Sequence, residues 1–319
     1  MISVVIPTYN ARSFLREAID SVIAERHRGI SLEIIISDDC STDDSVAIAR
    51  SYGDAVRIIS AERNGGGAAA RNRGIRAATG DFIALLDCDD LCLPGRFTKG
   101  LKAIEETGAD LVFSDVKILG DVEGPTWLEI VGSKNILSQK TENGVLKHPL
   151  DLLCELGNFI LPSTVLVKRN VFTAAGDFNE KIMCADDYEF FARVAAKGTL
   201  IAFIAEPLAL RRVHGGNLSQ NWRRRYTSEL LTIETIERLP NLSDSSKKNL
   251  KKWEALLHRQ MAALELDSRD FTALRRELGE SLASQFSFKV VLYAVASYIA
   301  PDLLYRVRAR KAHATHSNK

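Results

Sequence analysis

The stretch FIALLDCDD, residues 82–90, runs from five apolar residues directly into a segment with three carboxylates. The apolar part predicts a strand that is buried on both faces, as in a parallel sheet. Open parallel sheets bind their ligands where strands end at the carboxyl edge. Two carboxylates one residue apart, Asp87 and Asp89, suit a divalent cation whose other ligands are phosphate oxygens. For an Asp-x-Asp triplet by itself, the alternative is a solvated acidic turn.

Strand and helix patterns alternate over the first ninety residues. Strands are expected at 2–6, 32–36, 56–59 and 82–86, and helices at 11–25, at about 43–52 and at 68–78. Pro7 is expected to end the first strand, and Ser41 or Thr42 can cap the second helix. Because parallel strands joined by helices require right-handed crossovers, the pattern predicts a doubly wound α/β fold.

Two common nucleotide-binding loops are missing from this α/β pattern. The turn after the first strand has no Gly-x-Gly-x-x-Gly, and the chain has no Gly-x-x-x-x-Gly-Lys-Ser/Thr. The run Gly65-Gly66-Gly67 matches neither motif. Two interpretations of this run remain: it is a flexible turn, or it allows the backbone to approach a phosphate closely.

The pattern loosens between two further groups of elements. Helices are expected at 94–106 and 186–197, and strands at 110–116, 164–167 and 200–204. Residues 117–148 scatter Gly, Pro, Ser and Asn among Trp127, Ile130 and Ile136. This segment reads as an insertion that faces the substrate or as an ordinary surface excursion.

From Leu218 onward the composition is helical and highly charged, so we expect a C-terminal α-helical appendage of four or five helices at 218–319. Residues 286–300 are nearly apolar, with Lys289 as the one charged residue, but are too few to span a membrane. Basic residues follow Pro301. This segment has two interpretations. It makes peripheral contact with an anionic membrane surface, or it is a core helix followed by a solvated tail.

Charge and cysteine content limit the function classes. A net charge of +1 gives no reason to expect a nucleic-acid partner. The five cysteines are scattered, which is typical of a reducing compartment, and Cys88 and Cys92 suit small core positions better than a zinc site. The chain starts with a strand pattern and no signal peptide, so a cytoplasmic location is expected.

Several stretches occur together in one order over about the first 215 residues. They are VVIPTYN at 4–10, DDCSTD at 38–43, the segments 64–74 and 80–90, AGDF at 175–178 and DDYEFFAR at 186–193. In this order they resemble the family 2 inverting glycosyltransferases, which have the GT-A fold. The resemblance implies a GT-A-like mixed, mainly parallel sheet, with nucleotide-sugar, metal and acceptor sites in residues 1–217.

The resemblance also assigns the donor site. It implies that Asp39 reads the uracil N–H, that Arg71 lies beside the nucleotide and that Asp87 lies near the ribose. Pro7, Thr8 and Tyr9 would wall the nucleoside. The alternatives are that Asp39 caps the following helix and that Arg71 is a solvated helix charge.

For the metal, the resemblance implies Asp89 as a direct ligand and His214 as a further contact. A carboxylate, an imidazole and phosphate oxygens favour Mn²⁺ or Mg²⁺. The alternative is that His214, as a single histidine, has a structural role and binds no metal.

For the catalytic pair, the resemblance implies Asp187 as the base that takes the proton of the acceptor hydroxyl. Asp186 would then cap the helix that begins there, although the two roles could be exchanged. The helix dipole would lower the pKa of the base, whereas repulsion between the two carboxylates would raise it.

Processive family members carry Gln-x-x-Arg-Trp and several membrane spans. Here the nearest segment, residues 220–225, has a different order, which favours the transfer of one sugar per encounter. Arg223 to Arg225 could close over the donor, face anionic lipid or form a solvated helix face.

We therefore expect transfer from a UDP-sugar, such as UDP-glucose, to a carbohydrate acceptor. The acceptor we favour is a lipid-linked oligosaccharide of bacterial exopolysaccharide, capsule or O-antigen synthesis, on the cytoplasmic face of the inner membrane. The alternatives are a sugar-phosphate nucleotidyltransferase and a nucleotide-sugar-binding module without catalysis.

Overall fold

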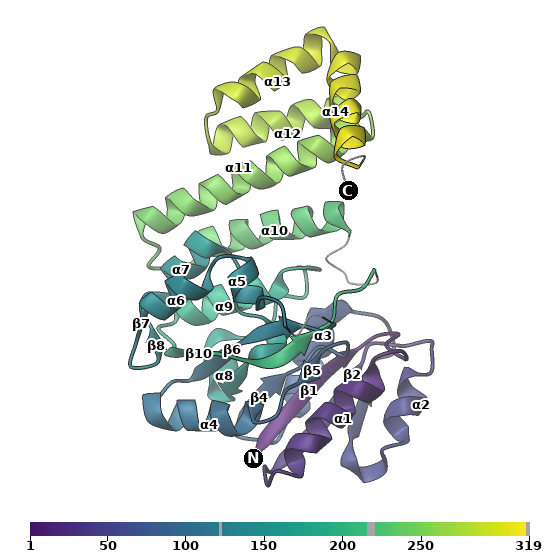
Figure 1. Cartoon of the computed structure of the whole chain (residues 1–319), viewed down its shortest axis with the longest axis vertical. Helices are drawn as coiled ribbons and strands as arrows, with labels where there is room; N and C mark the ends of the chain where they lie inside the picture. The colour runs from purple at the N-terminus through teal and green to yellow at the C-terminus, as the bar shows by residue number, and fades with distance from the viewer. Residues whose placement is uncertain (121–122, 216–220, 317–319) are drawn as a thin grey trace.

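A ten-stranded mixed sheet is the centre of the fold (Figure 1). The computed structural model describes residues 1–120, 123–215 and 221–316. The strands are β1 (Ile2–Thr8), β2 (Leu32–Asp38), β3 (Arg57–Ser60), β4 (Phe82–Leu85), β5 (Leu91–Cys92), β6 (Leu111–Ile118), β7 (Thr141–Glu142), β8 (Val145–Leu146), β9 (Leu166–Lys168) and β10 (Ile201–Arg211). Their order is β3-β2-β1-β4-β9-β6-β10-β8-β7, and β5 pairs with β10.

The long strand pairings are parallel and the short ones are antiparallel. Parallel pairs join β1 to β2 and β4, β2 to β3, and β6 to β10. The antiparallel strand β9 lies between β4 and β6, and β5, β7 and β8 add short antiparallel pairs. The prediction of a doubly wound, mixed and mainly parallel α/β fold is confirmed.

Helices cover the sheet and then extend beyond it. In the sheet region they are α1 (Leu15–Arg26), α2 (Ser45–Arg50), α3 (Gly66–Ala77), α4 (Arg96–Thr107), α5 (Trp127–Ile130), α6 (Lys134–Gln139), α7 (Pro149–Leu156), α8 (Asn170–Ala175) and α9 (Asp186–Ala196), with 3₁₀ turns η1 (Gly53–Ala55) and η2 (Pro162–Thr164). The C-terminal helices are α10 (Trp222–Glu237), α11 (Asp244–Asp267), α12 (Phe271–Ser284), α13 (Phe288–Ile299) and α14 (Pro301–His316).

The two faces of the sheet have separate apolar cores. Alternate residues of β1 divide between them, so that Val4 packs with α1, α2 and α4 while Val5 packs with α3, α8 and α9. Both side chains are fully buried. This is the pattern of a sheet covered by helices on both faces.

The second of these cores continues into the C-terminal helices. Ile233 and Ile236 of α10 and Leu250 and Leu257 of α11 belong to the same apolar cluster as Val5. The distal helices α12 to α14 pack with the end of α11 around a smaller cluster that contains Leu266 and other residues. The helices therefore stack in tiers that lead away from the sheet along the longest axis (Figure 1). The expected boundary at residues 217–218 lies outside the described residues.

Pro7 does not end the first strand. Pro7 and Thr8 pair with Ser37 and Asp38 of β2, so β1 runs two residues further than expected. The backbone of Val5 faces β4, because its carbonyl accepts from the N–H of Leu86. Pro7 faces the same side, where β4 has already ended at Leu85. The missing N–H of proline therefore costs no ladder hydrogen bond.

Two further expectations need correction. Neither Ser41 nor Thr42 caps α2, because Asp43 accepts from the N–H of Ser45 at 2.9 Å and Asp44 precedes the helix. The strand expected at 200–204 continues to Arg211 through an irregular register at Pro207. The segment 117–148 contains α5, α6 and the β7–β8 pair. Within the described part of the chain, no helix has both the length and the apolarity to cross a membrane.

Candidate active site

The carboxyl ends of β1, β2 and β4 meet at one edge of the sheet. Thr8 pairs with Asp38 where β1 and β2 end, and β4 ends two residues before Asp87. The neighbouring side chains of this edge are Asp39 and the acidic turn, by which we mean Asp87, Asp89 and Asp90. The topology therefore places Asp39 and the acidic turn along the same edge of the sheet.

Asp90 is the buried member of the acidic turn. Its carboxylate accepts from the hydroxyl of Ser163 at 2.5 Å and from the backbone N–H of Arg212 at 3.0 Å. The same Ser163 hydroxyl accepts from the N–H of Asp87 at 3.0 Å. Burial, with the charges of Asp87 and Asp89, raises the pKa of Asp90 to about 7. Asp90 therefore fixes the shape of the turn and leaves Asp87 and Asp89 to face the site.

Asp89 is joined to the far end of β10. The antiparallel pairing of β5 with β10 brings the residues after Arg211 back to the acidic turn. There, Nε2 of His214 lies 3.0 Å from Oδ2 of Asp89, and the ring of Phe14 packs against the imidazole with ring centres 4.5 Å apart. Burial and the charge of Asp87 raise the pKa of Asp89, whereas His214 acts in the opposite direction.

This donor set fits a divalent cation that also binds the substrate. Among the described residues, no three His, Cys, Asp or Glu side chains are grouped closely enough to hold a metal ion by themselves. Asp89 and His214 supply one carboxylate and one imidazole that converge, and the neighbouring carboxylates favour a positive charge there. A Mn²⁺ or Mg²⁺ ion would therefore take its remaining ligands from donor phosphates or water.

Arg71 of α3 connects the acidic turn to α9. Its Nη2 donates to Oδ1 of Asp87 at 2.8 Å, and its Nη1 donates to Oδ2 of Asp186 at 2.7 Å. The ring of Phe178 lies 5.7 Å from the guanidinium carbon. The side chain is largely buried, so Arg71 is not the solvated helix charge that the sequence left open. One planar guanidinium holds carboxylates from two segments that are about a hundred residues apart.

Asp187 is the second residue of α9. Its Oδ2 accepts from the side-chain amide of Asn158 at 3.0 Å, and its Oδ1 accepts from the N–H of Tyr188 at 2.9 Å. Burial, with the charge of Asp186, raises the pKa of Asp187 to about 7, although Arg71 acts to lower it. The raised pKa has the direction expected from repulsion between the two carboxylates, and a carboxylate with this pKa suits a general base.

Asp186 does not cap α9, contrary to the sequence expectation. The residue before the helix is Ala185, which has a φ of 70° and no side-chain capping bond. Asp186 is the first helical residue, and its carboxylate is taken by Arg71 instead. The hydroxyl of Thr232 on α10 donates to the carbonyl of Ala185 at 3.2 Å, so the start of α9 is held from the C-terminal helices.

Asp39 faces the start of α3 rather than α2. Its Oδ2 accepts from the N–H groups of Gly65 and Gly66 at 3.0 and 2.7 Å, and its Oδ1 accepts from Arg73 at 3.3 Å. Asp39 therefore does not cap the helix that follows it in the chain. These contacts also occupy two N–H groups of the glycine run, which are then not offered to a phosphate. A carboxylate has about four acceptor positions, so Oδ1 retains capacity for a ligand N–H.

The three residues expected to wall the nucleoside differ in exposure. Pro7 and Thr8 are buried within β1, and the hydroxyl of Thr8 donates to the carbonyl of Ile6 at 3.2 Å. Tyr9 follows the strand and is half exposed. Of the three, Tyr9 is the side chain that the structure presents at the edge of the sheet.

The basic residues that begin α10 have partners within the helical region. Arg223 pairs with Glu265 of α11 through both guanidinium nitrogens, and Arg225 donates to Glu229 at 2.6 Å. Arg223 therefore links α10 to α11, and Arg225 is paired within α10 itself. Gln220 of the segment 220–225 lies outside the described residues.

Sequence reasoning did not find Asn158 or Ser163 as site residues. Asn158 follows α7 and Ser163 belongs to η2, and both face carboxylates that are distant in sequence. Neither belongs to a motif. Only the placement of β9 beside β4 brings this segment to the acidic turn.

Comparison with known proteins agrees with this arrangement. The family described as glycosyl transferase family 2 matches residues 3–161. The amylovoran biosynthesis glycosyltransferase AmsB of Erwinia amylovora is 30% identical over 65% of this chain and 68% of its own length. The succinoglycan biosynthesis protein ExoO of Rhizobium meliloti is 26% identical over 99% of this chain and 90% of its own length.

Solved structures share the fold at low sequence identity. S. aureus TarS 1–349 in complex with UDP-GlcNAc superposes with a TM-score of 0.70 at 17% identity, covering 98% of this chain and 92% of that one. The mannosyltransferase PcManGT from Pyrobaculum calidifontis, in complex with GDP-Man and Mn²⁺, gives a TM-score of 0.61 at 20% identity, covering 96% and 82%. The family match, the similarity to AmsB and the shared fold together show that this chain belongs to glycosyl transferase family 2, with a GT-A-like fold.

Proposed function

We propose that the chain is a metal-dependent inverting glycosyltransferase that moves one sugar from a nucleotide-diphosphate donor to a carbohydrate acceptor. The observation that carries the proposal is the double ion pair of Arg71, which joins Asp87 of the acidic turn to Asp186, the neighbour of Asp187. The donor-side carboxylates and the base thus belong to one connected site.

A UDP-sugar is the donor we propose. Asp39, Tyr9 and Asp87 surround the edge of the sheet where a nucleoside of this family would lie, and Asp39 retains an acceptor position for a base N–H. The TarS structures were solved with UDP-GlcNAc and with UDP, which supports a uridine donor.

Asp89 and His214 would hold the cation, Mn²⁺ or Mg²⁺. When bound, such an ion stabilises the negative charge that develops on the departing diphosphate. The mannosyltransferase solved with Mn²⁺ supports this assignment. Arg71 contributes a second, permanent positive charge on the same side of the site.

Asp187 is the proposed base. It takes the proton from the acceptor hydroxyl while that oxygen forms a bond to the anomeric carbon, and the bond from that carbon to the diphosphate breaks. The electron pair of the broken bond leaves with the nucleotide. A single displacement inverts the anomeric centre, through a transition state like that of glycoside hydrolysis. Asn158 orients the carboxylate, and Asp186 lies one residue away as the link to Arg71.

For the acceptor we propose a carbohydrate of bacterial polysaccharide assembly, in lipid-linked form. ExoO and AmsB, which are similar over two thirds or more of their own lengths, are named for succinoglycan and amylovoran biosynthesis. A lipid-linked acceptor would place the reaction at a membrane surface.

The two alternatives have less support. Family membership favours sugar transfer over nucleotidyl transfer. A module that only binds nucleotide sugars has no need of a carboxylate with a raised pKa opposite the donor side, as Asp187 has.

The test begins with a thermal-shift screen of the full chain against UDP, GDP and their sugars, with and without Mn²⁺. The expected result is a melting temperature raised most by one UDP-sugar together with the ion. That donor is then incubated with lipid-linked oligosaccharides, and the new linkage is assigned by NMR. Retention of the donor configuration in the product would contradict the inverting mechanism, and the absence of any shift would contradict the donor assignment.

A further inference from the structure

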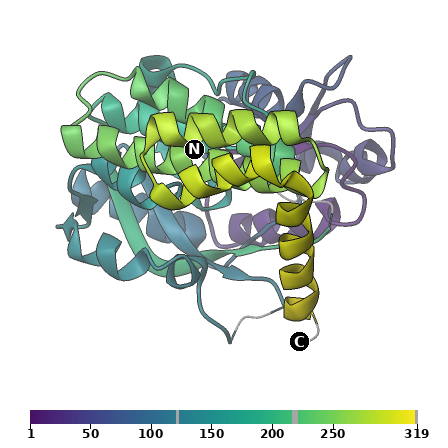
Figure 2. The same ribbon diagram turned by 90° about the horizontal axis from the view of Figure 1, so that it is seen from above.

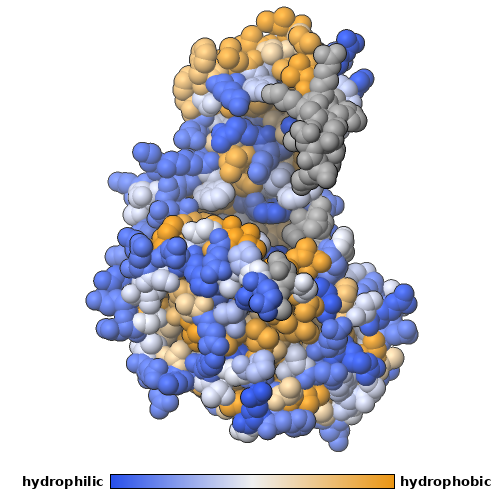
Figure 3. Space-filling model, in the orientation of Figure 1, coloured by the Kyte–Doolittle hydropathy of each residue, from blue (hydrophilic) through white to orange (hydrophobic). Residues whose placement is uncertain are grey.

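The last two helices carry much of the exposed apolar surface of the molecule. Eighteen large apolar side chains are exposed among the described residues, and nine of them lie between Phe286 and Val307. The space-filling view shows this concentration as orange atoms over α13, at the end of the molecule furthest from the sheet (Figure 3). Exposed apolar surface gathered in one place is typical of a binding surface.

The outer face of α13 is a continuous apolar stripe. Its residues, Phe288, Leu292, Val295 and Ile299, are spaced as one side of a helix and are 68%, 55%, 49% and 78% exposed. We call these four residues the α13 stripe. The opposite side of the same helix holds Val290 and Ser297, which are buried. Packing against α12 therefore does not account for the stripe.

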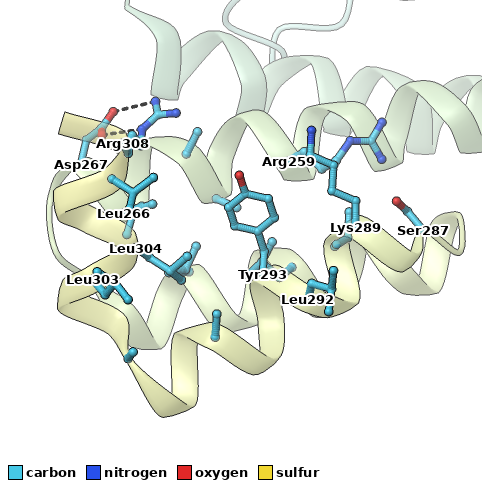
Figure 4. A pocket seen from close by; sticks show the side chains of 18 of the residues that line it. Arg259, Leu266, Asp267, Ser287, Lys289, Leu292, Tyr293, Leu303, Leu304 and Arg308 are labelled. Atoms are coloured by element: carbon cyan, nitrogen blue, oxygen red, sulfur yellow. Dashed lines mark hydrogen bonds and ion pairs between the residues drawn. The ribbon is translucent and has the colours of Figure 1, made fainter. Parts of the chain in front are cut away.

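Beside the stripe is a groove of about 1180 Å³ between α11 and the α13–α14 pair (Figure 4). Its lining includes Tyr293 and Leu303. At one end, Arg308 is held by Asp267 at 2.6 and 2.9 Å. At the other end lie Arg259 and Lys289, and within the described residues neither has a carboxylate within ion-pair distance. Two cations therefore stand beside an apolar surface without a negative partner.

Charge distinguishes between two possible partners of the α13 stripe, a second copy of the chain and an anionic bilayer. The segment from Phe286 to Lys319 contains six Lys or Arg and one acidic residue, Asp302, whereas the rest of the chain has four more acidic than basic residues. Two copies of such a segment would repel each other if their stripes met. An anionic bilayer surface is complementary to it, because each Lys or Arg near such a surface is worth about 1 kcal/mol.

Helix α14 turns away from α13 after Pro301, as the view from above shows (Figure 2). With twelve residues, α13 is too short to span a bilayer, but its length suits a helix that lies in the plane of the interface. Arg306 is exposed and lies on α14, the helix whose residues Leu303 and Leu304 line the groove. Apolar stripe, unpaired cations and basic segment thus belong to the same end of the molecule.

We propose that α13 and α14 dock the protein on the surface of a bilayer that contains anionic phospholipid. The α13 stripe enters the boundary between headgroups and acyl chains, and Lys289, Arg259 and Arg306 lie among the lipid phosphates. The inference concerns where the chain binds and does not depend on the donor or acceptor proposed above.

The test is co-sedimentation of the full chain with vesicles of phosphatidylcholine alone or with about 30% phosphatidylglycerol, which supplies the negative charge. The stripe variant is Phe288→Ser with Ile299→Ser. Its matched control is Ile130→Ser with Val131→Ser, two exposed apolar residues of the sheet region. We expect the wild type and the control to bind anionic vesicles and the stripe variant to lose about tenfold or more in affinity. Circular dichroism and thermal melts verify that each variant is folded.

A charge variant and a spectroscopic probe separate insertion from simple attraction. Lys289→Glu with Arg306→Glu should reduce binding to anionic vesicles, whereas the exposed control Lys181→Glu should not. Raising salt from about 0.05 to about 0.5 M should weaken wild-type binding. A Phe288→Trp substitution should shift tryptophan emission to shorter wavelength when anionic vesicles are added, because the indole enters an apolar environment.

Three results would overturn the proposal. The stripe variant could bind vesicles as tightly as the wild type, or neutral vesicles could bind as tightly as anionic ones. Light scattering could instead show a wild-type dimer that the stripe variant breaks, with no vesicle binding, which would make the stripe a contact between copies. Because the assay contains no nucleotide sugar, these results are independent of whether the proposed transfer takes place.

Discussion

The side-chain amide of Asn158 lies 3.0 Å from Oδ2 of Asp187 and donates a hydrogen bond to it. Asn158 follows α7 and Gly157, whose φ is 77°, so a left-handed residue turns the chain toward α9 just before the contact. A hydrogen bond to a carboxylate favours its charged form. Asn158 therefore opposes the burial that raises the pKa of the proposed base.

We predict that Asn158→Ala moves the acidic limb of the pH–rate profile upward by about one pH unit. A base must be ionised to accept a proton, so activity near pH 7 should fall by about fivefold and the deficit should narrow at pH 9. The measurement is kcat against pH with saturating donor. Asn170→Ala, at an exposed position of α8, is the control, and an unshifted profile in Asn158→Ala would remove Asn158 from this role.

Asp187→Asn should stabilise the protein while abolishing transfer. Because the folded pKa of about 7 lies above the ordinary value of 3.8, the folded state binds its proton more tightly than the unfolded state does. Stability therefore falls as pH rises from about 4 to about 7, and each pKa unit is worth about 1.4 kcal/mol. The asparagine side chain does not titrate, so the increase in the free energy of unfolding over the wild type should be larger at pH 8 than at pH 5. Urea unfolding at the two pH values measures this increase, and an equal increase at both would contradict the raised pKa of Asp187.

The same variant should keep wild-type affinity for UDP, since Asp187 is placed on the acceptor side. Calorimetric titration with UDP measures this. An equal loss of nucleotide binding and of transfer would show that Asp187 acts on the donor and is not the base.

Arg71→Ala should destabilise the protein by about 3–5 kcal/mol, because the buried Asp186 and the partly exposed Asp87 lose their common partner. The cost should become smaller as the pH is lowered, because burial raises the pKa of Asp186 and protonation removes its uncompensated charge. Arg71→Lys keeps the charge but cannot reach both carboxylates with a planar fork, so a higher KM for donor and a lower kcat are expected. The control is Arg76→Ala, whose pair with Asp177 is at the surface, with an expected cost below about 1 kcal/mol.

Asp89→Ala and His214→Ala should each weaken the metal-dependent part of donor binding by more than about tenfold, which is about 1.4 kcal/mol. A chelator should have the same effect on the wild type and little further effect on either variant. Calorimetric titration of UDP with and without Mn²⁺ measures this. His27→Ala, at an exposed position after α1, is the control. A variant whose UDP affinity still depends fully on Mn²⁺ would not have lost a ligand.

The fold was predictable where the pattern is local. The apolar run before Asp87 and the alternation of strand and helix follow from periodicity, and a C-terminal region of four or five helices follows from composition; the described part of the chain has these elements. Prediction failed where tertiary pairing overrides a local signal. Pro7 remains in β1 because its neighbour β4 has ended, and Pro207 remains in β10 because the register with β6 shifts around it.

The site was predictable from motifs only in part. Motifs led to Asp89 and His214, which meet at 3.0 Å although they are 125 positions apart. The hydrogen-bond partners Ser163 and Asn158 had no sequence signal, because a single Ser or Asn gains its role from the strand and helix that place it. For Asp39, the motif gave the residue but not its hydrogen-bond partners, since its carboxylate faces the start of α3 rather than the helix that follows it.

The hydrogen bond from the Thr232 hydroxyl to the carbonyl of Ala185 connects α10 directly to the start of the helix that carries the proposed base. α10 in turn packs on α11, whose far end carries α12 to α14. A continuous series of helix contacts therefore connects the α13 stripe to the residue that precedes Asp186 and Asp187.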